Sequence, residues 1–264
     1  MLKHLEAIRY VTPLREGGSL PAIVETDEPS CYVLKFHGAG QGPRALIAEL
    51  VSGELARASG LPLPEIAFIE LAAGFGRSEG DPEIQDLLRA SVGLNLGLRY
   101  LPGSATYDPV AVPNVDPLLA SSIVWFDAYT TNVDRTAHNT NMLIWQGDLY
   151  LIDHGSTLYF HHNWTGYEKR IRTPFAAIAK HVLLPFASQI EAADRLLSAR
   201  LSGEVIRRVV ELIPDDWLGD EPRFASAAEH RQAYVEYLLA RLEEPRAFVE
   251  EAQKQRALLV GAEG

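Results

Sequence analysis

The segment from residue 132 to residue 155 most constrains how this chain can fold. Two short apolar runs, residues 142–145 and 149–152, flank a turn that contains Gly147, and this pattern predicts a β-hairpin. Neither run alternates apolar and polar residues, so both faces of the hairpin are expected to be buried. The polar residues are therefore concentrated in the loop that enters the hairpin and at the hairpin's open end.

The expected register brings two polar side chains together at that open end. If Trp145 pairs with Leu149 across a three-residue loop, Asn141 lies opposite Asp153. Their Cα atoms would then be about 5 Å apart. Amide and carboxylate oxygens bind divalent cations such as magnesium, so this arrangement predicts a metal site.

The polar residues of this segment fit phosphoryl transfer from a magnesium nucleotide. In that reaction an Asp orients the attacking hydroxyl group, while an Asn and a second Asp hold the magnesium ions that bridge the phosphates. Such residues are also common in ordinary loops, where they satisfy the turn backbone, so the prediction rests on their combined order. The candidates in chain order are Asp134, Asn139 or Asn141, and Asp153.

Composition narrows the possible functions. The chain has 264 residues and a formal net charge of −11, which disfavours a nucleic-acid partner because phosphate backbones normally require a basic surface. No apolar run approaches the roughly 20 residues needed to span a bilayer, and the first residues lack the apolar core of a signal peptide. A single cysteine, Cys31, fits a reducing compartment. We therefore expect a cytoplasmic protein without a membrane or nucleic-acid partner.

The first third of the sequence predicts a β-rich unit with a helix that carries acids. Residues 31–36 form an expected strand that contains Lys35, a cation that must reach a sheet edge or meet an anion. A helix is expected to begin at Pro43, and its Glu49 and Glu54 could both reach Lys35. Helical spacing places Glu54 closer to the apolar stripe, so spacing alone favours Glu54.

Residues 102–113 form the expected boundary between two lobes, because Pro, Gly and Ser end the preceding strand there. We assign residues 1–103 to a β-rich N-lobe and residues 104–264 to a mostly helical C-lobe, an α+β fold. A buried central helix beginning at Asp116 leads into the Asp134 loop. The other expected strands are residues 8–11, 22–25, 66–71 and 94–101, and the other expected helices are residues 82–89, about 175–200, and segments after Ser202, after Ser226 and from about Arg246.

Several of these segments together resemble a known kinase family. The strand lysine, the helix acid, the catalytic loop and a hairpin that ends in Asp-His-Gly occur in the order of the bilobal protein-kinase-like fold. More closely, residues 48–62, 132–135 and 151–155 resemble the HipA-like kinase family. The resemblance covers residues from about 15 to 160, and the C-terminal region matches only in its helical character.

The resemblance implies roles for the strand lysine, the helix acid and the catalytic aspartate. Lys35 would contact the nucleotide phosphates, and the family's helix start aligns Glu49 as its acidic partner. This choice goes against the helical spacing, which favours Glu54. Asp134 would act as the catalytic base.

The resemblance also implies a magnesium site and an adenine site. Asp153 would bind magnesium. The amide ligand is Asn139 by the usual kinase spacing, or Asn141 by its place directly before the strand, and the hairpin geometry favours Asn141. The backbone around Tyr100 and Leu101 would form the hinge that faces adenine.

Three features depart from the protein-kinase pattern. The turn Gly17-Gly18-Ser19 lacks the full Gly-x-Gly-x-x-Gly loop, although its backbone N–H groups could still cradle phosphate. His154 replaces the usual phenylalanine after the metal-binding aspartate. No extended activation loop follows, which argues against activation by loop phosphorylation.

We therefore expect an ATP- and magnesium-dependent kinase that transfers the γ-phosphate to a Ser or Thr hydroxyl group of a protein. Two alternatives on the same fold are a small-molecule kinase and an AMP transferase, since fold does not determine chemistry. A third alternative, of another class, is a nucleotide-binding regulator with little turnover. The sequence implies ATP as a partner and leaves the hydroxyl-bearing acceptor unidentified.

Overall fold

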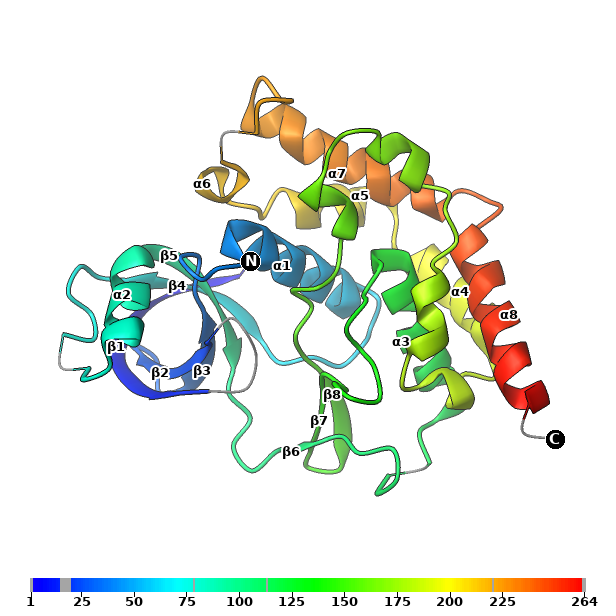
Figure 1. Cartoon of the computed structure of the whole chain (residues 1–264), viewed down its shortest axis with the longest axis horizontal. Helices are drawn as coiled ribbons and strands as arrows, with labels where there is room; N and C mark the ends of the chain where they lie inside the picture. The colour runs from blue at the N-terminus through cyan, green and yellow to red at the C-terminus, as the bar shows by residue number, and fades with distance from the viewer. Residues whose placement is uncertain (1, 15–19, 78, 113, 220, 263–264) are drawn as a thin grey trace.

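The chain folds into a β-barrel followed by a mostly helical region (Figure 1). The computed structural model describes residues 2–14, 20–77, 79–112, 114–219 and 221–262. The predicted α+β class, with strands in the first part and helices in the second, is confirmed. The division at residue 103 into two lobes stays a prediction.

Five strands close into a barrel in the order β1-β2-β3-β5-β4. They are β1 (Lys3–Pro13), β2 (Ala22–Thr26), β3 (Cys31–Lys35), β4 (Ile66–Leu71) and β5 (Gly93–Arg99). The pairing of β1 with β4 is parallel and closes the barrel, whereas the other neighbours are antiparallel. Apolar side chains fill the inside as a core separate from that of the helical region.

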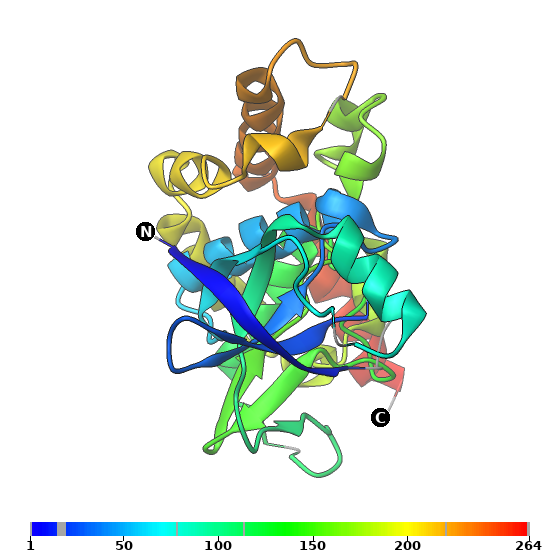
Figure 2. The same ribbon diagram turned by 90° about the vertical axis from the view of Figure 1, so that its left-hand side faces the viewer.

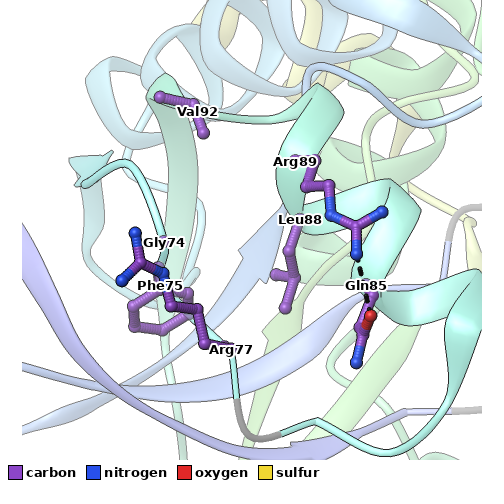
Figure 3. A pocket seen from close by; sticks show the side chains of 8 residues that line it. Gly74, Phe75, Arg77, Gln85, Leu88, Arg89 and Val92 are labelled. Atoms are coloured by element: carbon purple, nitrogen blue, oxygen red, sulfur yellow. Dashed lines mark hydrogen bonds between the residues drawn. The ribbon is translucent and has the colours of Figure 1, made fainter.

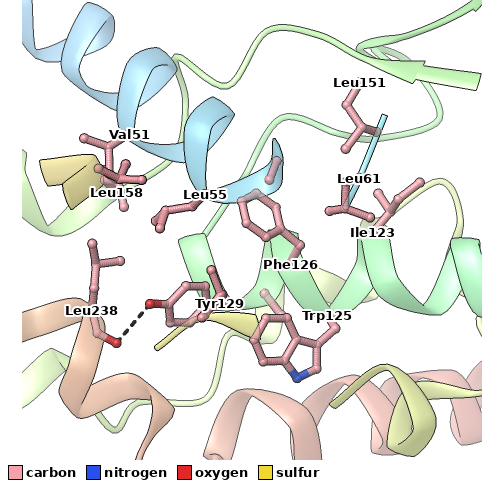
Figure 4. Close-up of a cluster of buried hydrophobic side chains, with 14 of the residues drawn as sticks. Val51, Leu55, Leu61, Ile123, Trp125, Phe126, Tyr129, Leu151, Leu158 and Leu238 are labelled. Carbon is pink, nitrogen blue, oxygen red and sulfur yellow. Dashed lines mark hydrogen bonds between the residues drawn. The ribbon is translucent and has the colours of Figure 1, made fainter. Parts of the chain in front are cut away.

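The helical region is built around α3 (Pro117–Thr130), which is buried over most of its length, as predicted. Trp125, Phe126 and Tyr129 of this helix belong to a large apolar cluster (Figure 4). The Tyr129 hydroxyl donates a hydrogen bond of 3.0 Å to the backbone oxygen of Leu238. No helix among the described residues combines the length and apolar composition needed to cross a membrane. The remaining helices are α1 (Gly42–Ala58), α2 (Pro82–Ala90), α4 (Ile190–Arg200), α5 (Gly203–Val210), α6 (Asp215–Leu218), α7 (Ala227–Leu242) and α8 (Ala247–Ala262).

Helix α1 lies between the barrel and the helical region (Figure 2). It contacts β4 and β5 of the barrel and α5 and α6 of the helical region. Gly53 permits a close approach to the barrel, because a Cβ atom there would lie 2.4 Å from Cδ1 of Ile66. Since neighbours cover α1 on several sides, polar as well as apolar residues are buried along it, including Glu49 and Ser52.

Strand β3 places Lys35 on the outer face of the barrel. Side chains alternate between the two faces of a strand. Tyr32 and Leu34 are fully buried in the barrel core, whereas Cys31, Val33 and Lys35 are half-buried on the other face. The Lys35 side chain therefore lies on the outside of the barrel, at the end of β3.

The predicted hairpin is present, but its turn is one residue shorter than expected. The last residue of β7 (Met142–Trp145) pairs with the first residue of β8 (Asp148–Leu151). The two turn residues, Gln146 and Gly147, have φ angles of 54° and 93°. Two residues with positive φ form the type of tight turn whose twist matches that of paired strands.

The shorter turn shifts the polar end of the hairpin by one position. The N–H group of Ile152 donates a 3.0 Å hydrogen bond to the backbone oxygen of Asn141, so these two residues lie opposite each other. The expected pairing of Asn141 with Asp153 is therefore wrong. Asp153 follows the paired strands and has a φ of 55°, which departs from strand geometry. A third strand, β6 (Ala105–Thr106), pairs with β7.

The continuous helix expected over residues 175–200 is also wrong. Two short 3-10 helices precede α4, and His181 lies between them in an extended conformation. His181 pairs with Thr136 of the loop that enters the hairpin. Pro185 has no N–H group and therefore cannot contribute to an uninterrupted α-helix. The two 3-10 helices are Ala176–Lys180 and Leu184–Phe186.

The loop between β3 and α1 packs against the end of α2, and one substitution tests this contact. A Cβ atom on Gly38 would lie 2.6 Å from the backbone oxygen of Ala90, whereas one on Gly40 would meet nothing within 4 Å. We expect Gly38→Ala to lower the free energy of unfolding by about 1–3 kcal/mol, because the backbone must move. Gly40→Ala, the matched control, should change it by less than about 1 kcal/mol. Urea denaturation measures both values, and equal effects would contradict the tight contact.

Candidate active site

Lys35 lies between two carboxylates that come from other elements. Its Nζ atom is 2.5 Å from Oε2 of Glu49 and 2.7 Å from Oδ1 of Asp153. Glu49 belongs to α1, and Asp153 follows β8 by two residues. The fold thus brings three predicted site residues, distant in the sequence, into direct contact.

Glu49, and not Glu54, is the acid beside Lys35. Glu49 is fully buried, whereas Glu54 forms a 3.0 Å ion pair with Arg57 of the same helix. Helical spacing favoured Glu54 because it assumed a single apolar stripe. Since neighbours cover α1 on several sides, distance from one stripe does not imply exposure. The role of Glu49 in catalysis stays a prediction.

The contact between Lys35 and Glu49 stabilises the charged form of both side chains. Burial alone would raise the pKa of Glu49, but the positive charge of Lys35 and the contact with His154 lower that pKa to about 2. For Lys35, burial acts to lower the pKa, but Glu49 and Asp153 outweigh burial and raise the pKa above its usual value. Lys35 is therefore a cation, and Glu49 an anion, at neutral pH.

Asp134 lies in the loop between α3 and β7, where two asparagines hold its side chain. Nδ2 of Asn139 donates to Oδ2 of Asp134 at 2.9 Å, and Nδ2 of Asn141 donates to the same oxygen at 3.3 Å. Oδ1 of Asn132 accepts a 3.1 Å hydrogen bond from the backbone N–H of Asp134. Both predicted metal-binding asparagines therefore contact the predicted base.

A buried polar network supports this loop from the side of α3. Asp127 accepts hydrogen bonds from Nδ2 of Asn132 at 2.9 Å and from Nε of Arg135 at 2.6 Å. Nε2 of His181 is 2.9 Å from the same carboxylate. Nδ1 of His181 accepts a 3.0 Å hydrogen bond from the N–H of Leu183, so Nε2 carries the hydrogen and donates to Asp127.

Arg135 joins the loop to the open end of the hairpin. Its guanidinium group is buried and donates to the backbone oxygens of Asn141 and Ile152, the second at 3.3 Å. Asn141 and Asp153 flank this point with φ angles of 47° and 55°, a conformation that Asn and Asp adopt more readily than most residues. The loop that contains Asp134 and the hairpin end therefore form one hydrogen-bonded unit.

Sequence reasoning did not identify Asp127 or His181 as supports of the site. A signal for Asp127 exists, because it is the one charged residue of a mostly apolar helix and burying an unpaired charge is costly. His181 lies where a continuous helix was expected, so that error concealed its contact with the loop.

The donor groups at the hairpin end fit magnesium. Magnesium prefers oxygen ligands and usually takes one or two carboxylates from the protein, with phosphates and water completing its coordination. The Asp153 side chain is 47% exposed, and only its Oδ1 contacts Lys35. Asn139 and Asn141 each bind Asp134 through nitrogen, which leaves their side-chain oxygens available. The described residues contain no group of three or more His, Cys, Asp or Glu side chains suited to a metal.

The predicted adenine hinge lies at the junction of the barrel and the helical region. The N–H group of Tyr100 donates a 2.9 Å hydrogen bond to the oxygen of Cys31, and the Leu101 side chain is buried. The predicted phosphate turn at residues 17–19 lies outside the described residues.

Two apolar side chains that sequence reasoning missed lie on the Lys35 face of the barrel. Val33 precedes Lys35 by two residues, and Ile23 lies opposite Val33 on the neighbouring strand β2. Both side chains are half-buried. The available signal is strand alternation, which puts residues two apart on the same face.

A cavity of about 300 Å³ lies apart from these residues, between the loop after β4 and helix α2 (Figure 3). Phe75, Leu88 and Val92 supply apolar walls, and Arg77 and Arg89 supply positive charge. None of the predicted site residues that the structure describes lines this cavity, so it is separate from the contact of Lys35 with Glu49 and Asp153.

Comparisons with known proteins bear on both fold and chemistry. A family model described as HipA-like kinase matches residues 8–251 of this chain. The crystal structure of a Helicobacter pylori proinflammatory kinase, CtkA, is similar, with a TM-score of 0.56 and 13% sequence identity, and the match covers 91% of this chain and 95% of that chain. At this identity the likeness shows the fold alone, and it confirms the predicted kinase-like fold. No curated protein matches the sequence.

Proposed function

The chain belongs to the HipA-like kinase family, and from this premise we propose that it transfers the γ-phosphate of ATP to a serine or threonine hydroxyl group of a protein. The observation that carries the proposal is the contact of Lys35 with Glu49 and Asp153 at the end of the hairpin. Phosphoryl transfer depends mostly on positioning and on neutralising charge, and this contact concentrates the charged groups that do both.

In this proposal Lys35 binds the ATP phosphates and Glu49 holds the ammonium group in place. Asp153 and Asn141 hold magnesium, with Asn139 as the alternative amide ligand. Magnesium, when bound, neutralises charge on the phosphates. The partial exposure of Asp153 supports this role, because its second carboxylate oxygen has no hydrogen-bond partner among the described residues.

We assign the role of base to Asp134. Both asparagine amides donate to its Oδ2 atom, and no hydrogen bond to Oδ1 occurs among the described residues. Oδ1 can therefore accept a hydrogen bond from the acceptor's hydroxyl group and take its proton during transfer. Asn139 and Asn141 keep the carboxylate in that orientation.

The nucleotide's base is proposed to bind between the two lobes, residues 1–103 and residues 104–264. Backbone groups around Tyr100 and Leu101 would face adenine from the hinge. Ile23 and Val33 offer half-buried apolar surface on the same barrel face as Lys35. An apolar surface next to convergent polar groups is typical of small-molecule sites.

Thermal unfolding with magnesium ATP tests the nucleotide site. A ligand that binds the folded state at a hundredfold excess over its dissociation constant stabilises that state by roughly 2.7 kcal/mol. We expect this stabilisation for the native protein and its loss in Asp153→Ala, which removes the proposed magnesium ligand. Asp148→Ala, at an exposed position of the same hairpin, is the control and should keep the full effect. Equal stabilisation of all three proteins would exclude Asp153 as the ligand.

Labelled ATP distinguishes the proposed transfer from its alternatives. With a protein acceptor, we expect radioactivity from γ-labelled ATP, and not from α-labelled ATP, to appear on serine or threonine. Transfer of the α-label would show AMP transfer instead. Phosphorylation of a small molecule alone would refute the protein acceptor, and ATP binding without any release of ADP would favour a regulatory protein.

A further inference from the structure

His154 is a buried titratable residue that the proposed reaction does not use. It follows Asp153 directly and is fully buried. Its ring packs edge to face against the ring of Phe126, with 6.4 Å between the ring centroids. Neither ring nitrogen has a hydrogen-bond partner among the described residues. Burying an imidazole without hydrogen-bond partners is costly. A polar function at this position would account for the histidine.

The polar group that faces His154 is the acid that holds Lys35. Nδ1 of His154 is 3.7 Å from Oε1 of Glu49, and both side chains are fully buried. Oε2 of Glu49 contacts Lys35 at 2.5 Å, whereas Oε1 has no hydrogen-bond partner among the described residues. The two oxygens of one buried carboxylate thus face two different nitrogen-bearing side chains.

The turn after His154 fixes its position relative to α1. The hydroxyl of Thr157 lies 2.7 Å from that of Ser52 and donates to the backbone oxygen of His154, also at 2.7 Å. The same hydroxyl is 3.4 Å from the backbone oxygen of Ala48, the residue before Glu49. The turn and the Glu49 side of α1 are therefore joined by hydrogen bonds, so His154 and Glu49 keep their relative placement.

We propose that His154 is a positioning residue that directs Nδ1–H at Oε1 of Glu49 and thereby keeps Oε2 of that carboxylate on Lys35. This inference rests on the proposed kinase function. In this structure, Lys35 contacts both Glu49 and Asp153. When magnesium ATP is bound, the proposed role of Asp153 is to bind the magnesium ion. The position of the Lys35 ammonium group then depends on Glu49. If only one oxygen of the Glu49 carboxylate has a partner, the carboxylate can rotate away from Lys35. Phenylalanine at this position could not supply the second anchor.

Kinetics of two substitutions test the positioning role. His154→Phe keeps an aromatic ring and removes Nδ1–H, whereas His154→Asn places an amide nitrogen near the position of Nδ1. We expect His154→Phe to lower kcat by about 10–100-fold, as supporting residues of a catalytic group typically do, with KM for ATP changed by less than about threefold. His154→Asn should recover most of the lost kcat. Full activity of His154→Phe, or no recovery in His154→Asn, would overturn the inference.

A double-mutant cycle tests whether His154 acts through Glu49. If it does, His154→Phe should cause no further loss of kcat in a Glu49→Gln background. If the two substitutions lower kcat by independent factors that multiply in the double variant, His154 acts on a group other than Glu49. Thermal unfolding of each variant distinguishes loss of positioning from loss of the fold.

The ¹⁵N NMR signals of the His154 ring provide a test that does not depend on activity. We expect the hydrogen on Nδ1, and a change in that signal in Glu49→Gln. An Nδ1 atom that carries no hydrogen would refute the contact with Glu49. If the native protein transfers no phosphate, the proposed function fails, whereas the NMR signals still decide whether His154 donates to Glu49.

Discussion

Replacing Asp134 by alanine is expected to lower kcat by a factor of about 10²–10⁴, the usual contribution of a general base. The loss follows from removing the carboxylate whose Oδ2 accepts from Asn139 and Asn141 and whose Oδ1 would accept the acceptor's proton. The dissociation constant of magnesium ATP should stay near the native value, because Lys35 and Asp153 are unchanged. Steady-state kinetics with titration calorimetry measure the two quantities separately.

Asp134→Asn refines this prediction. It keeps the size of the side chain and removes its ability to take a proton, so its kcat should also be low. Asp148→Ala replaces an exposed aspartate of the hairpin and should keep native kcat. Near-native turnover in Asp134→Ala would show that another group orients the acceptor hydroxyl.

Replacing Asp127 by alanine is expected to lower the free energy of unfolding by about 3–5 kcal/mol, because it leaves the buried Arg135 without its anion. The substitution also removes the hydrogen bonds from Asn132 and His181. Since these residues support the loop that contains the proposed base Asp134, kcat should fall even under conditions where the protein is folded. Chemical denaturation and kinetics below the unfolding transition measure the two effects.

An exposed aspartate provides the matched control for this substitution. Asp216 is exposed, and its side chain makes no hydrogen bond or ion pair with any other described residue. Asp216→Ala should change the free energy of unfolding by less than about 0.5 kcal/mol. Similar losses in Asp127→Ala and Asp216→Ala would contradict the supporting role of the buried network.

The stabilisation by Asp127 should depend on pH. Burial would raise the pKa of Asp127, but the charge of Arg135 and the contact with His181 hold it well below the usual range. A carboxylate with a depressed folded-state pKa stabilises the protein above its unfolded pKa, roughly 4, and this contribution is lost as the pH falls further. The difference in unfolding free energy between native protein and Asp127→Ala should therefore shrink below about pH 4.

Much of the fold could be predicted from local patterns in the sequence. A turn with Gly147 between two apolar runs predicts the hairpin, and Asp116 before a proline predicts the start of α3, where its side chain caps the helix by accepting a 2.8 Å hydrogen bond from the N–H of Leu119. These features depend on interactions between residues a few positions apart, so the sequence contains them. The order of motifs also predicted the family and the kinase-like fold.

The parts that could not be predicted depend on how elements pack together. Helical spacing did not select Glu49, because the covering of α1 on several sides is a property of the assembled molecule. The buried partners of Asp127 include His181, which lies 54 positions away in the chain. The hairpin register depends on the length of the turn. Because the turn is one residue shorter than expected, Asn141 lies opposite Ile152 instead of Asp153.

The sequence by itself therefore determined most of the elements, their order and the family of this protein. Residue spacing alone left open which acid meets Lys35. The resemblance pointed to Glu49, and the tertiary structure brings the two side chains together. Lys35 contacts Glu49 where α1 lies close to the barrel at Gly53 and is joined to the segment after the hairpin by the hydrogen bond between Ser52 and Thr157. Contacts of this kind join residues far apart in the chain, and their geometry follows from the packing of whole elements rather than from the spacing of residues within one of them.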